Sequence, residues 1–561
     1  MRQIYFELMK KTLSAYSDEH IKRYFNTVKK EGLTEHGFPR LTANIGILIS
    51  KGIREDLLPL FTEMMDFCTS TIPNVKAAND FSVREIIACI EEIEKSAIAS
   101  IIGGGKISEW KRNISTIIPE RCYDRFAVSK TDDLRNWALF TGSSEYYRLS
   151  GGLGGNMDFI DLQIETQFPW FDCNGMYMDS KDSENRQPIM YDLVTRSLFA
   201  IILDRGYNGK HRERMDSIIK SAGELTLRMQ SVSGEIPFGG RSNQFIHNEC
   251  WLLTVYEYEI KRYTRQGNTA KAREFSEAAA RALRNVEHWL DKEPIRHIKN
   301  RFDTATRYGC EHYAYFDKYM ITAASGLFTA NLISDGNIPL EYVEDNSTAA
   351  TLTSRHFGKM FLKSGGYFLE MDMDADPHYD CSGVGRIHRK GAPSALCMSL
   401  PCPSDPVYKT DTHKNGTSLS VGVKKGDGWH FATGPDTEYE VLSISENGAA
   451  EATVRCSFSN GERVTADYRV EENGVQICAK SDGYVGIMLP AFLFDGETST
   501  DINTSENTLT VRYGGYVCEY YSDSEIKKTN IMGGNRNGYY QAYLVEGHGR
   551  IVVRIEIKKD M

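Results

Sequence analysis

Apolar residues recur at helical spacing along the first 335 residues of the chain. This pattern predicts long helices at residues 4–16, 19–30, 54–71, 82–102, 132–148, 156–170, 191–205, 212–230, 243–264, 270–292 and 313–332. The connecting loops are rich in Gly, Asn and Asp, and no sequence repeat is evident. Stacked helix hairpins in a closed or horseshoe-shaped α/α toroid are therefore favoured over a solenoid. The loops at one end of such a ring are expected to build a cleft.

Beyond a linker at residues 334–339, the hydrophobic pattern changes to short alternating segments. These predict strands at residues 367–371, 417–423, 429–432, 439–444, 450–457, 463–471, 475–479, 485–489, 508–513, 516–521, 539–544 and 550–557. Asn-Gly dipeptides between several of them are typical of hairpin turns. The expected fold class is multidomain α and β, with an N-terminal (α/α) toroid domain at 1–335 and a C-terminal antiparallel β-sandwich domain at 336–561.

Composition narrows the class of protein. A chain of 561 residues exceeds what one core usually supports, which agrees with two domains. A net charge of -10 excludes a general nucleic-acid binder. The twelve cysteines include no C-x-x-C pair, which favours free thiols in a reducing compartment. No segment has the length of a membrane span, and the first residues lack the apolar centre of a signal peptide. We therefore expect a cytoplasmic protein without a nucleic-acid or membrane partner, and the sequence leaves open whether it forms a homo-oligomer.

The first candidate for chemistry is a loop that leads into a helix at residues 234–251. If the helix begins at Asn243, then Asn243, His247 and Trp251 share one face at four-residue spacing. An amide, an imidazole and an indole would then line one wall. The alternative for each residue is structural: Asn243 caps the helix, His247 is a hydrogen-bonded core histidine and Trp251 packs.

A second polar segment, residues 301–319, holds four tyrosines, two arginines, one histidine and three carboxylates at the entry to a predicted helix. A buried hydroxyl without a hydrogen-bond partner costs about 1–3 kcal/mol. A helix with a purely structural role is therefore not expected to begin with so many tyrosines. We interpret the segment as part of a binding site. The alternative is a hydrogen-bonded structural cluster.

Three further features are candidates for the cleft. Trp137 and Tyr191 lie in unusually polar-aromatic segments. Aromatic planes at the rim of a cleft suit the C–H faces of sugar rings, although both residues could instead belong to the core of the toroid. Residues 378–391 form a basic, glycine-rich segment that is expected to be a loop reaching into the cleft. No cofactor is expected. A divalent metal is the weaker alternative, and its candidate ligands, whose spacing matches no strong zinc pattern, are His378, Cys381, His388 and His413.

This combination resembles the heparinase II/III-like polysaccharide lyases and the related exo-acting alginate lyases. Asn243, His247 and Asn248 are similar to the family's Asn/His pair, which neutralises a uronate carboxylate and can take a proton. The order His247-Asn248 differs from the contiguous Asn-His order of the family. Tyr313 or Tyr308 is similar to the tyrosine that serves as base and acid.

The resemblance implies a carbon-oxygen lyase that cleaves a uronate-containing glycan by β-elimination. The segment from Arg386 to His388 is similar to sandwich residues that complete the family's cleft. Without a secretion signal, short imported oligosaccharides are the expected substrate. Cations such as Arg307 are expected to lower the pKa of the active tyrosine. The expected catalytic residues are His247, Tyr313, Tyr308, Asn243 and His388. The expected substrate-binding residues are Arg241, Asn248, Glu249, Trp251, Arg307, Glu311, His312, Arg386, Tyr191 and Trp137.

Two other functions remain open from the sequence. A glycoside hydrolase on the same toroid would need two carboxylates, about 5–5.5 Å apart for retention or ~6.5–9.5 Å apart for inversion. Its candidate carboxylates are Glu235, Glu249, Asp303, Glu311 and Asp317. A non-catalytic carbohydrate-binding protein is the third possibility, and it would bind a glycan without turnover.

Overall fold

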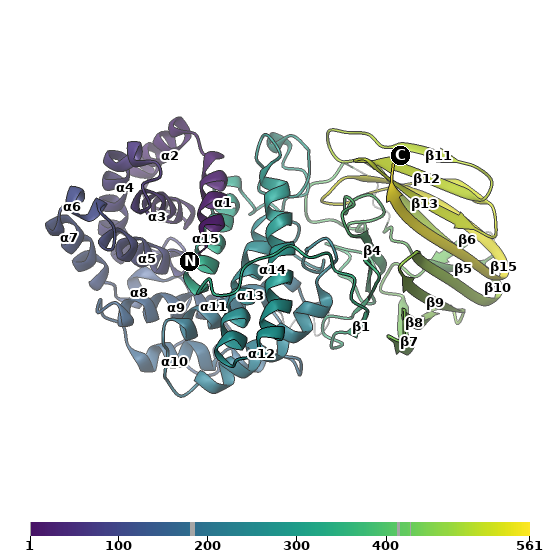
Figure 1. The fold of residues 1–561 in the computed structure, drawn as a ribbon, viewed down its shortest axis with the longest axis horizontal. Helices are drawn as coiled ribbons and strands as arrows, with labels where there is room; N and C mark the ends of the chain where they lie inside the picture. Colours follow the sequence, from purple (N-terminus) through teal and green to yellow (C-terminus); the bar gives the residue numbers. More distant parts are fainter. Residues whose placement is uncertain (1, 180–185, 412–415, 427, 561) are drawn as a thin grey trace.

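The computed structural model describes residues 2–179, 186–411, 416–426 and 428–560. Within these residues, helices fill the chain up to Ile333 and antiparallel strands follow from Ala349. The helical part and the sheets lie side by side along the long axis of the molecule (Figure 1). The predicted fold class, an α/α toroid followed by an antiparallel β-sandwich, is confirmed.

Six helices form a closed inner ring. They are α3 (Gly37–Ser50), α5 (Val83–Glu94), α9 (Trp137–Ser150), α11 (Ile189–Asp204), α13 (His247–Arg265) and α15 (Phe316–Ile333). Each contacts the next, and α15 returns to contact α3. These helices are apolar on most of their surface because neighbours surround them, and α3 buries every residue except Ser50.

Outer helices pack against this ring. They are α1 (Gln3–Ser14), α2 (Asp18–Glu31), α4 (Leu58–Thr71), α7 (Gly104–Ser115), α10 (Met157–Glu165), α12 (Arg212–Met229) and α14 (Thr269–Leu290), with the short α6 (Ile98–Ile102) and α8 (Pro119–Cys122) between them. Periodicity did not predict α3 or α7, and it joined α5 and α6 into one helix.

The strands form two antiparallel sheets. The smaller has the order β1 (Ala349–Leu352), β2 (Lys359–Ser364), β3 (Tyr367–Asp372) and β4 (Gly383–Arg389). The larger has the order β11 (Asp501–Thr504), β12 (Thr508–Tyr513), β13 (Tyr516–Ser522), β15 (Tyr539–Lys559), β10 (Gly474–Phe494), β9 (Arg463–Glu471), β8 (Ala450–Phe458) and β7 (Thr437–Ser445). The strands β5 (Val421–Lys425), β6 (Gly428–Phe431) and β14 (Ile526–Gly534) join it by pairing with β10, β5 and β15 respectively.

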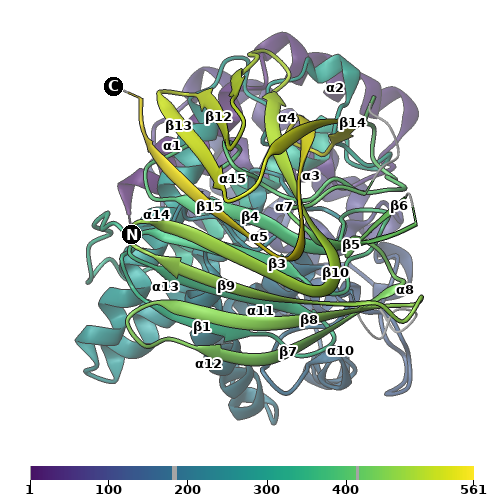
Figure 2. The same ribbon diagram turned by 90° about the vertical axis from the view of Figure 1, so that its right-hand side faces the viewer.

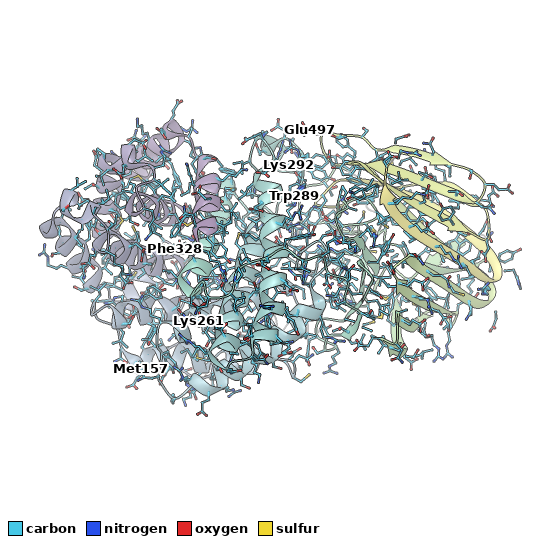
Figure 3. All side chains as sticks on the ribbon, in the orientation of Figure 1. Met157, Lys261, Trp289, Lys292, Phe328 and Glu497 are labelled. Atoms are coloured by element: carbon cyan, nitrogen blue, oxygen red, sulfur yellow. The ribbon has the colours of Figure 1, made fainter. Side chains whose placement is uncertain are left out.

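The smaller sheet lies between the helices and the larger sheet, which faces the viewer in Figure 2. Successive side chains on a strand point to opposite faces. Accordingly, Phe361 and Phe368 belong to the core of the helical part, whereas Leu362 and Leu369 belong to the core shared with the larger sheet. Side chains fill the space between these layers (Figure 3). The helical part is therefore packed directly on the sandwich.

The basic segment at 378–391 is not the loop that the sequence predicted. Gly383–Arg389 is strand β4, which pairs with β3 and places Arg386 opposite Glu370 and His388 opposite Phe368. Its side chains up to His388 are buried, so the segment belongs to the layer beneath the helices. Among the described residues, no helix is both long and apolar enough to cross a membrane.

Candidate active site

A cavity of about 770 Å³ lies where the inner helices begin. Its walls include His36 and Arg40 from the start of α3, Asn136 and Trp137 from α9, Tyr191 from α11, His247 and Trp251 from α13, and Tyr319 from α15. Every described residue that lines it precedes Ala323. The cavity is thus built by the helical part, at the end of the ring where the helix N-termini gather.

Six of the side chains predicted from the sequence meet in this cavity. They are His247, Tyr313, Arg241, Tyr191, Trp137 and Trp251. The two polar segments of the sequence therefore converge in space, although about 60 residues separate them. His247 and Trp251 lie one turn apart on α13, as their four-residue spacing predicted.

His247 is the first residue of α13 and only 4% exposed. Its Nδ1 atom is buried and has no hydrogen-bond partner. Burial and then the positive charge of Arg40 lower the pKa of His247 to about 3. The imidazole is therefore neutral at neutral pH and can accept a proton.

Tyr313 and Tyr191 are joined through a serine. The Ser242 hydroxyl lies 3.2 Å from the hydroxyl of Tyr313 and 3.2 Å from that of Tyr191. Burial, followed by Tyr191 and Glu311, raises the pKa of Tyr313. Tyr319 completes the group: its ring contacts that of His247 edge-on at 5.4 Å between centroids. These phenols are protonated at neutral pH and can act as acids.

Arg241 is held in place by an ion pair with Asp179, a carboxylate that is almost completely buried. The guanidinium lies 4.5 Å from the centre of the Tyr191 ring. The amide of Asn136 donates to the same Asp179 at 3.4 Å. One buried carboxylate therefore orients a guanidinium and an amide on the same wall of the cavity.

The cavity has a positive balance of charge although the whole chain is negative. Its described lining has the cationic side chains Arg40, Arg125, Arg135, Arg241 and Lys318, and the carboxylates Glu35, Asp133 and Asp179. The N-termini of inner helices add partial positive charge at the same end. Such a surrounding favours an anionic ligand.

Nine of the predicted site residues lie outside the cavity lining. They are Tyr308, Asn243, His388, Asn248, Glu249, Arg307, Glu311, His312 and Arg386. Each has another position that the structure explains.

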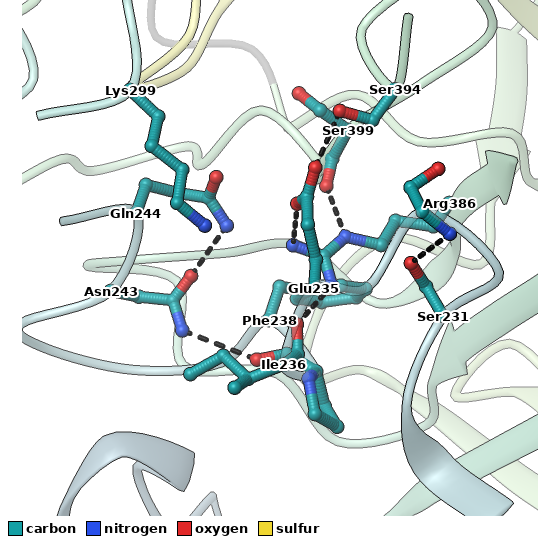
Figure 4. Close-up of polar contacts among 12 residues, drawn as sticks. Ser231, Glu235, Ile236, Phe238, Asn243, Gln244, Lys299, Arg386, Ser394 and Ser399 are labelled. Atoms are coloured by element: carbon teal, nitrogen blue, oxygen red, sulfur yellow. Dashed lines mark hydrogen bonds and ion pairs between the residues drawn. The ribbon is translucent and has the colours of Figure 1, made fainter. Parts of the chain in front are cut away.

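Asn243 does not share a helix face with His247, because α13 begins only at His247. Ser242 and Gln244 have φ angles of 58° and 62°, which keep this segment out of helical conformation. The Asn243 amide donates to the carbonyl of Pro237 at 3.3 Å and accepts from Gln244 at 2.7 Å (Figure 4). Asn248 instead stabilises the turn, donating to the Ser242 carbonyl at 3.0 Å.

Tyr308 and Arg307 also differ from their predicted roles. The Tyr308 ring stacks on Phe302 with centroids 3.6 Å apart, and burial raises its pKa. Arg307 lies over the exposed ring of Tyr315 at 4.3 Å and does not lower the pKa of either candidate tyrosine. The expected lowering was wrong because burial dominates at both phenols.

Buried ion pairs occupy the contact between the helices and the smaller sheet. Arg386 pairs with Glu235 at 3.2 Å (Figure 4) and with Glu370 at 3.2 Å. Glu249 pairs with Lys299 at 2.7 Å, and a ring nitrogen of His388 lies within hydrogen-bond distance of the Ser231 hydroxyl, at 3.2 Å. The sequence predicted that these polar side chains line a cleft, because charged residues are rarely buried in a protein core.

Glu311 lies directly behind the cavity. Its carboxylate accepts from the backbone N–H of Ser242 at 2.7 Å and from the Tyr313 hydroxyl at 3.4 Å, and it pairs with Arg536. His312, by contrast, is exposed and meets Tyr313 only edge-on. Glu311 is therefore a supporting residue of the site.

Several lining residues were not predicted from the sequence, among them Asn136, Asp179, Ser242, Tyr319 and Arg40. Asn136 directly precedes Trp137 and belongs to the same polar-aromatic segment that marked the tryptophan. Nothing in the sequence around Asp179 singled it out.

Within the described residues, no group of three or more His, Cys, Asp or Glu side chains is arranged to hold a metal ion. Of the candidate ligands, His388 is bonded to Ser231, and His378 lies 3.3 Å from Asp405. His413 lies outside the described residues.

No protein-family model matches the chain, and no curated protein sequence does either. Several solved structures are similar to it. Heparinase III matches at 8% identity over 85% of this chain and 77% of that one, with a TM-score of 0.39. The Streptomyces coelicolor A3 chondroitin AC lyase in complex with chondroitin sulphate matches at 10% identity over 99% and 83%, with a TM-score of 0.48. A Paenibacillus xanthan lyase matches at 9% identity over 92% and 53%, with a TM-score of 0.49. These are polysaccharide lyases, the kind of protein that the sequence pattern resembles.

Proposed function

We propose that this protein is a lyase that cleaves a uronate-containing glycan by β-elimination. One observation carries the proposal: His247, whose imidazole is neutral, Tyr313 and Arg241 all line a single cavity. β-Elimination requires a group that neutralises the uronate carboxylate, a base for the C5 proton and an acid for the departing 4-oxygen. The three side chains supply these functions.

In this proposal, Arg241 and Asn136 bind the carboxylate. Both are oriented by Asp179, so their donors are in place before substrate arrives. Removal of the C5 proton moves negative charge onto the carboxylate oxygens. A preorganised donor aimed at such developing charge contributes about 2.7–4 kcal/mol in well-studied sites.

His247 takes the C5 proton and Tyr313 protonates the leaving oxygen. The C5–H bond breaks, its electron pair forms the C4–C5 double bond, and the C4–O4 bond breaks as O4 accepts the phenolic proton. The protonation states agree with this assignment: the lowered pKa of His247 leaves the imidazole neutral, and the raised pKa of Tyr313 keeps its proton on. General acid and base groups each contribute about 10²–10⁴-fold to a rate.

The proposed substrates are short oligosaccharides. A volume of about 770 Å³ falls within the range of roughly 300–1,000 Å³ in which proteins enclose small ligands. Trp137, Tyr191 and Trp251 supply aromatic planes on its walls, which suit the C–H faces of sugars.

The geometry gives less support to a hydrolase. None of the five carboxylates considered for hydrolysis is among the described residues that line the cavity. Glu235, Glu249 and Glu311 are each engaged in a buried ion pair. A hydrolase would have to use the lining carboxylates Glu35, Asp133 or Asp179, of which Asp179 already pairs with Arg241.

Product analysis tests the proposal. The purified protein is incubated with tri- and tetrasaccharides of chondroitin, heparan sulfate and alginate, and the ultraviolet absorbance of a C4–C5 unsaturated uronate is followed. We expect one of these to yield the unsaturated product, and Tyr313→Phe and His247→Gln to abolish it while the protein stays folded. Tyr308→Phe, which alters a phenol outside the cavity, should retain activity. A saturated product with solvent oxygen incorporated would instead establish hydrolysis.

A further inference from the structure

Ser242 occupies an unusual position between two tyrosines of the cavity. Its side chain is almost fully buried, yet it lines the cavity. Its hydroxyl lies 3.2 Å from the hydroxyl of Tyr313 and 3.2 Å from the hydroxyl of Tyr191. A continuous chain of three hydroxyl groups therefore runs along one wall.

The backbone of Ser242 is held on both sides. Its N–H donates to Glu311 at 2.7 Å, and its carbonyl accepts from Asn248 at 3.0 Å. Its φ angle of 58° lies in the left-handed region, which disfavours any residue with a Cβ atom. Strained residues of this kind persist where the surroundings fix them, and they gather at functional sites. The direction of the hydroxyl is therefore set by the fold.

We propose that Ser242 is a positioning residue that passes a proton from Tyr191 to Tyr313, an inference that rests on the proposed elimination. When Tyr313 gives its proton to the leaving 4-oxygen, its oxygen takes the proton of the Ser242 hydroxyl. Ser242 in turn takes the proton of Tyr191. One O–H bond forms for each that breaks, and the negative charge moves to the Tyr191 phenolate.

Tyr191 is the better place for that charge. The Arg241 guanidinium lies 4.5 Å from its ring centre and opposes the rise that burial causes in the pKa of Tyr191. Asp179 and Glu311 also raise the pKa of Tyr191, but Arg241 is the largest influence on it after burial. At Tyr313, by contrast, the largest influences after burial are Tyr191 and Glu311, and both raise the pKa. Tyr191 faces the cavity, so it regains a proton from water after the product leaves. His247 releases its proton the same way, which restores the starting state.

The test uses Ser242→Gly and Ser242→Ala in the full-length protein, with an oligosaccharide that the wild type converts to unsaturated product. Both variants remove the hydroxyl, but glycine tolerates the left-handed φ angle better than alanine does. We expect kcat to fall about 100-fold in both, the lower end of the range of one general acid or base step, and KM to change less than about threefold. Tyr191→Phe should match them. Ser231→Ala, whose hydroxyl contacts His388 outside the cavity, should keep wild-type kcat.

A proton inventory in mixtures of light and heavy water separates relay from packing. The wild type should give a curved plot, because several protons move in one step, and the two Ser242 variants a linear one. Unchanged kcat in Ser242→Gly, or a curved plot that persists without the hydroxyl, would overturn the relay. A wild-type protein that forms no unsaturated product on any substrate would instead overturn the proposed function.

Discussion

Arg536 and Glu311 form a buried ion pair with two hydrogen bonds of 2.8 Å, although 225 residues separate them in the sequence. Each side chain is only 1% exposed. Arg536 belongs to the turn between β14 and β15, whereas Glu311 precedes α15. Because Glu311 also accepts hydrogen bonds from Ser242 and Tyr313, the larger sheet supports the cavity from behind without lining it.

Arg536→Met should destabilise the protein and slow the reaction. Removing one partner of a buried pair leaves the other charge uncompensated and costs about 3–5 kcal/mol. The freed Glu311 carboxylate would no longer hold Ser242 and Tyr313 in place, so kcat should fall as well. Urea denaturation and initial rates of product formation measure the two effects.

The matched control for Arg536 is Arg455→Met. Arg455 pairs with Glu440 at 2.9 Å on the protein surface, where both side chains are exposed. Exposed pairs contribute about 0–1 kcal/mol, so little should change. Equal losses of stability in the two variants would contradict the role assigned to the Arg536 pair.

Arg241→Gln should weaken substrate binding. The substitution removes the guanidinium that we assign to the uronate carboxylate, and charged hydrogen bonds of this kind contribute about 1.5–3 kcal/mol. We expect KM to rise roughly tenfold or more. Arg307→Gln, which removes a cation that precedes α15 and lies outside the cavity lining, should leave KM close to that of the wild type. A larger rise in KM for Arg307→Gln than for Arg241→Gln would show that the uronate carboxylate binds elsewhere.

The acid limb of the pH profile should lie well below the ordinary histidine value. His247 must be neutral to accept the C5 proton, and its pKa is lowered to about 3 by burial and Arg40. Lowering the pH from 7 to 5 should therefore not protonate His247 in the free enzyme. The profile of kcat/KM against pH reports this group. A loss of wild-type activity centred near pH 6.5 would contradict the assignment.

Hydrophobic periodicity predicted much of the ring but could not find α3. That helix begins Gly37-Phe38-Pro39 and contains Gly46, residues that usually indicate a break. Its burial on all sides also removes the polar face that makes a helix visible in a sequence. In the smaller sheet, β2 was missed for the same reason, since it is buried on both faces, whereas β3 was predicted although it is equally buried.

The site was predicted only where spacing and local structure agreed. His247 and Trp251 lie on one real helix, so their common face was correct. Asn243 failed because the left-handed residues Ser242 and Gln244 delay the helix start, and no propensity predicts such strain. Asn136, the amide that does line the cavity, comes from another helix altogether, and only the closure of the ring brings it near His247.

Gly46→Ala should destabilise the protein, because the inner ring leaves no space for a side chain at this position. An added methyl group at this position would lie 2.3 Å from Phe61 and 2.4 Å from Cys89. Overpacking of this kind costs about 1–3 kcal/mol and should lower the free energy of unfolding in urea. Gly105→Ala is the control, because its methyl group would meet nothing within 4 Å, and this change should be neutral or stabilising. An equal change in the free energy of unfolding of the two variants would contradict tight packing in the inner ring.

Stability should also depend on pH through Asp380, which anchors the segment that carries Arg241. Its carboxylate is buried and accepts from the backbone N–H of Gly240 at 2.7 Å. Burial raises the pKa of Asp380 to about 7, with Lys359 opposing the rise and Asp372 adding to it. The same cause raises the pKa of Glu370 to about 7. Lys359 already pairs with Asp372 at 2.7 Å, so it cannot neutralise all three carboxylates.

The sign of this dependence follows from proton linkage. Between pH ~4 and 7 the unfolded chain has released the Asp380 proton while the native state retains it, so raising the pH favours unfolding. The Asp380 contribution therefore declines by about 1.4 kcal/mol per pH unit over that window and is constant above pH 7. Asp380→Asn removes the titration, and its amide oxygen can still accept from Gly240. The free energy of unfolding of Asp380→Asn relative to the wild type should thus improve by about 1–3 kcal/mol between pH 5 and 7 in urea titrations. A difference that stays constant with pH, or that moves the other way, would mean that Asp380 is already ionised in the folded protein.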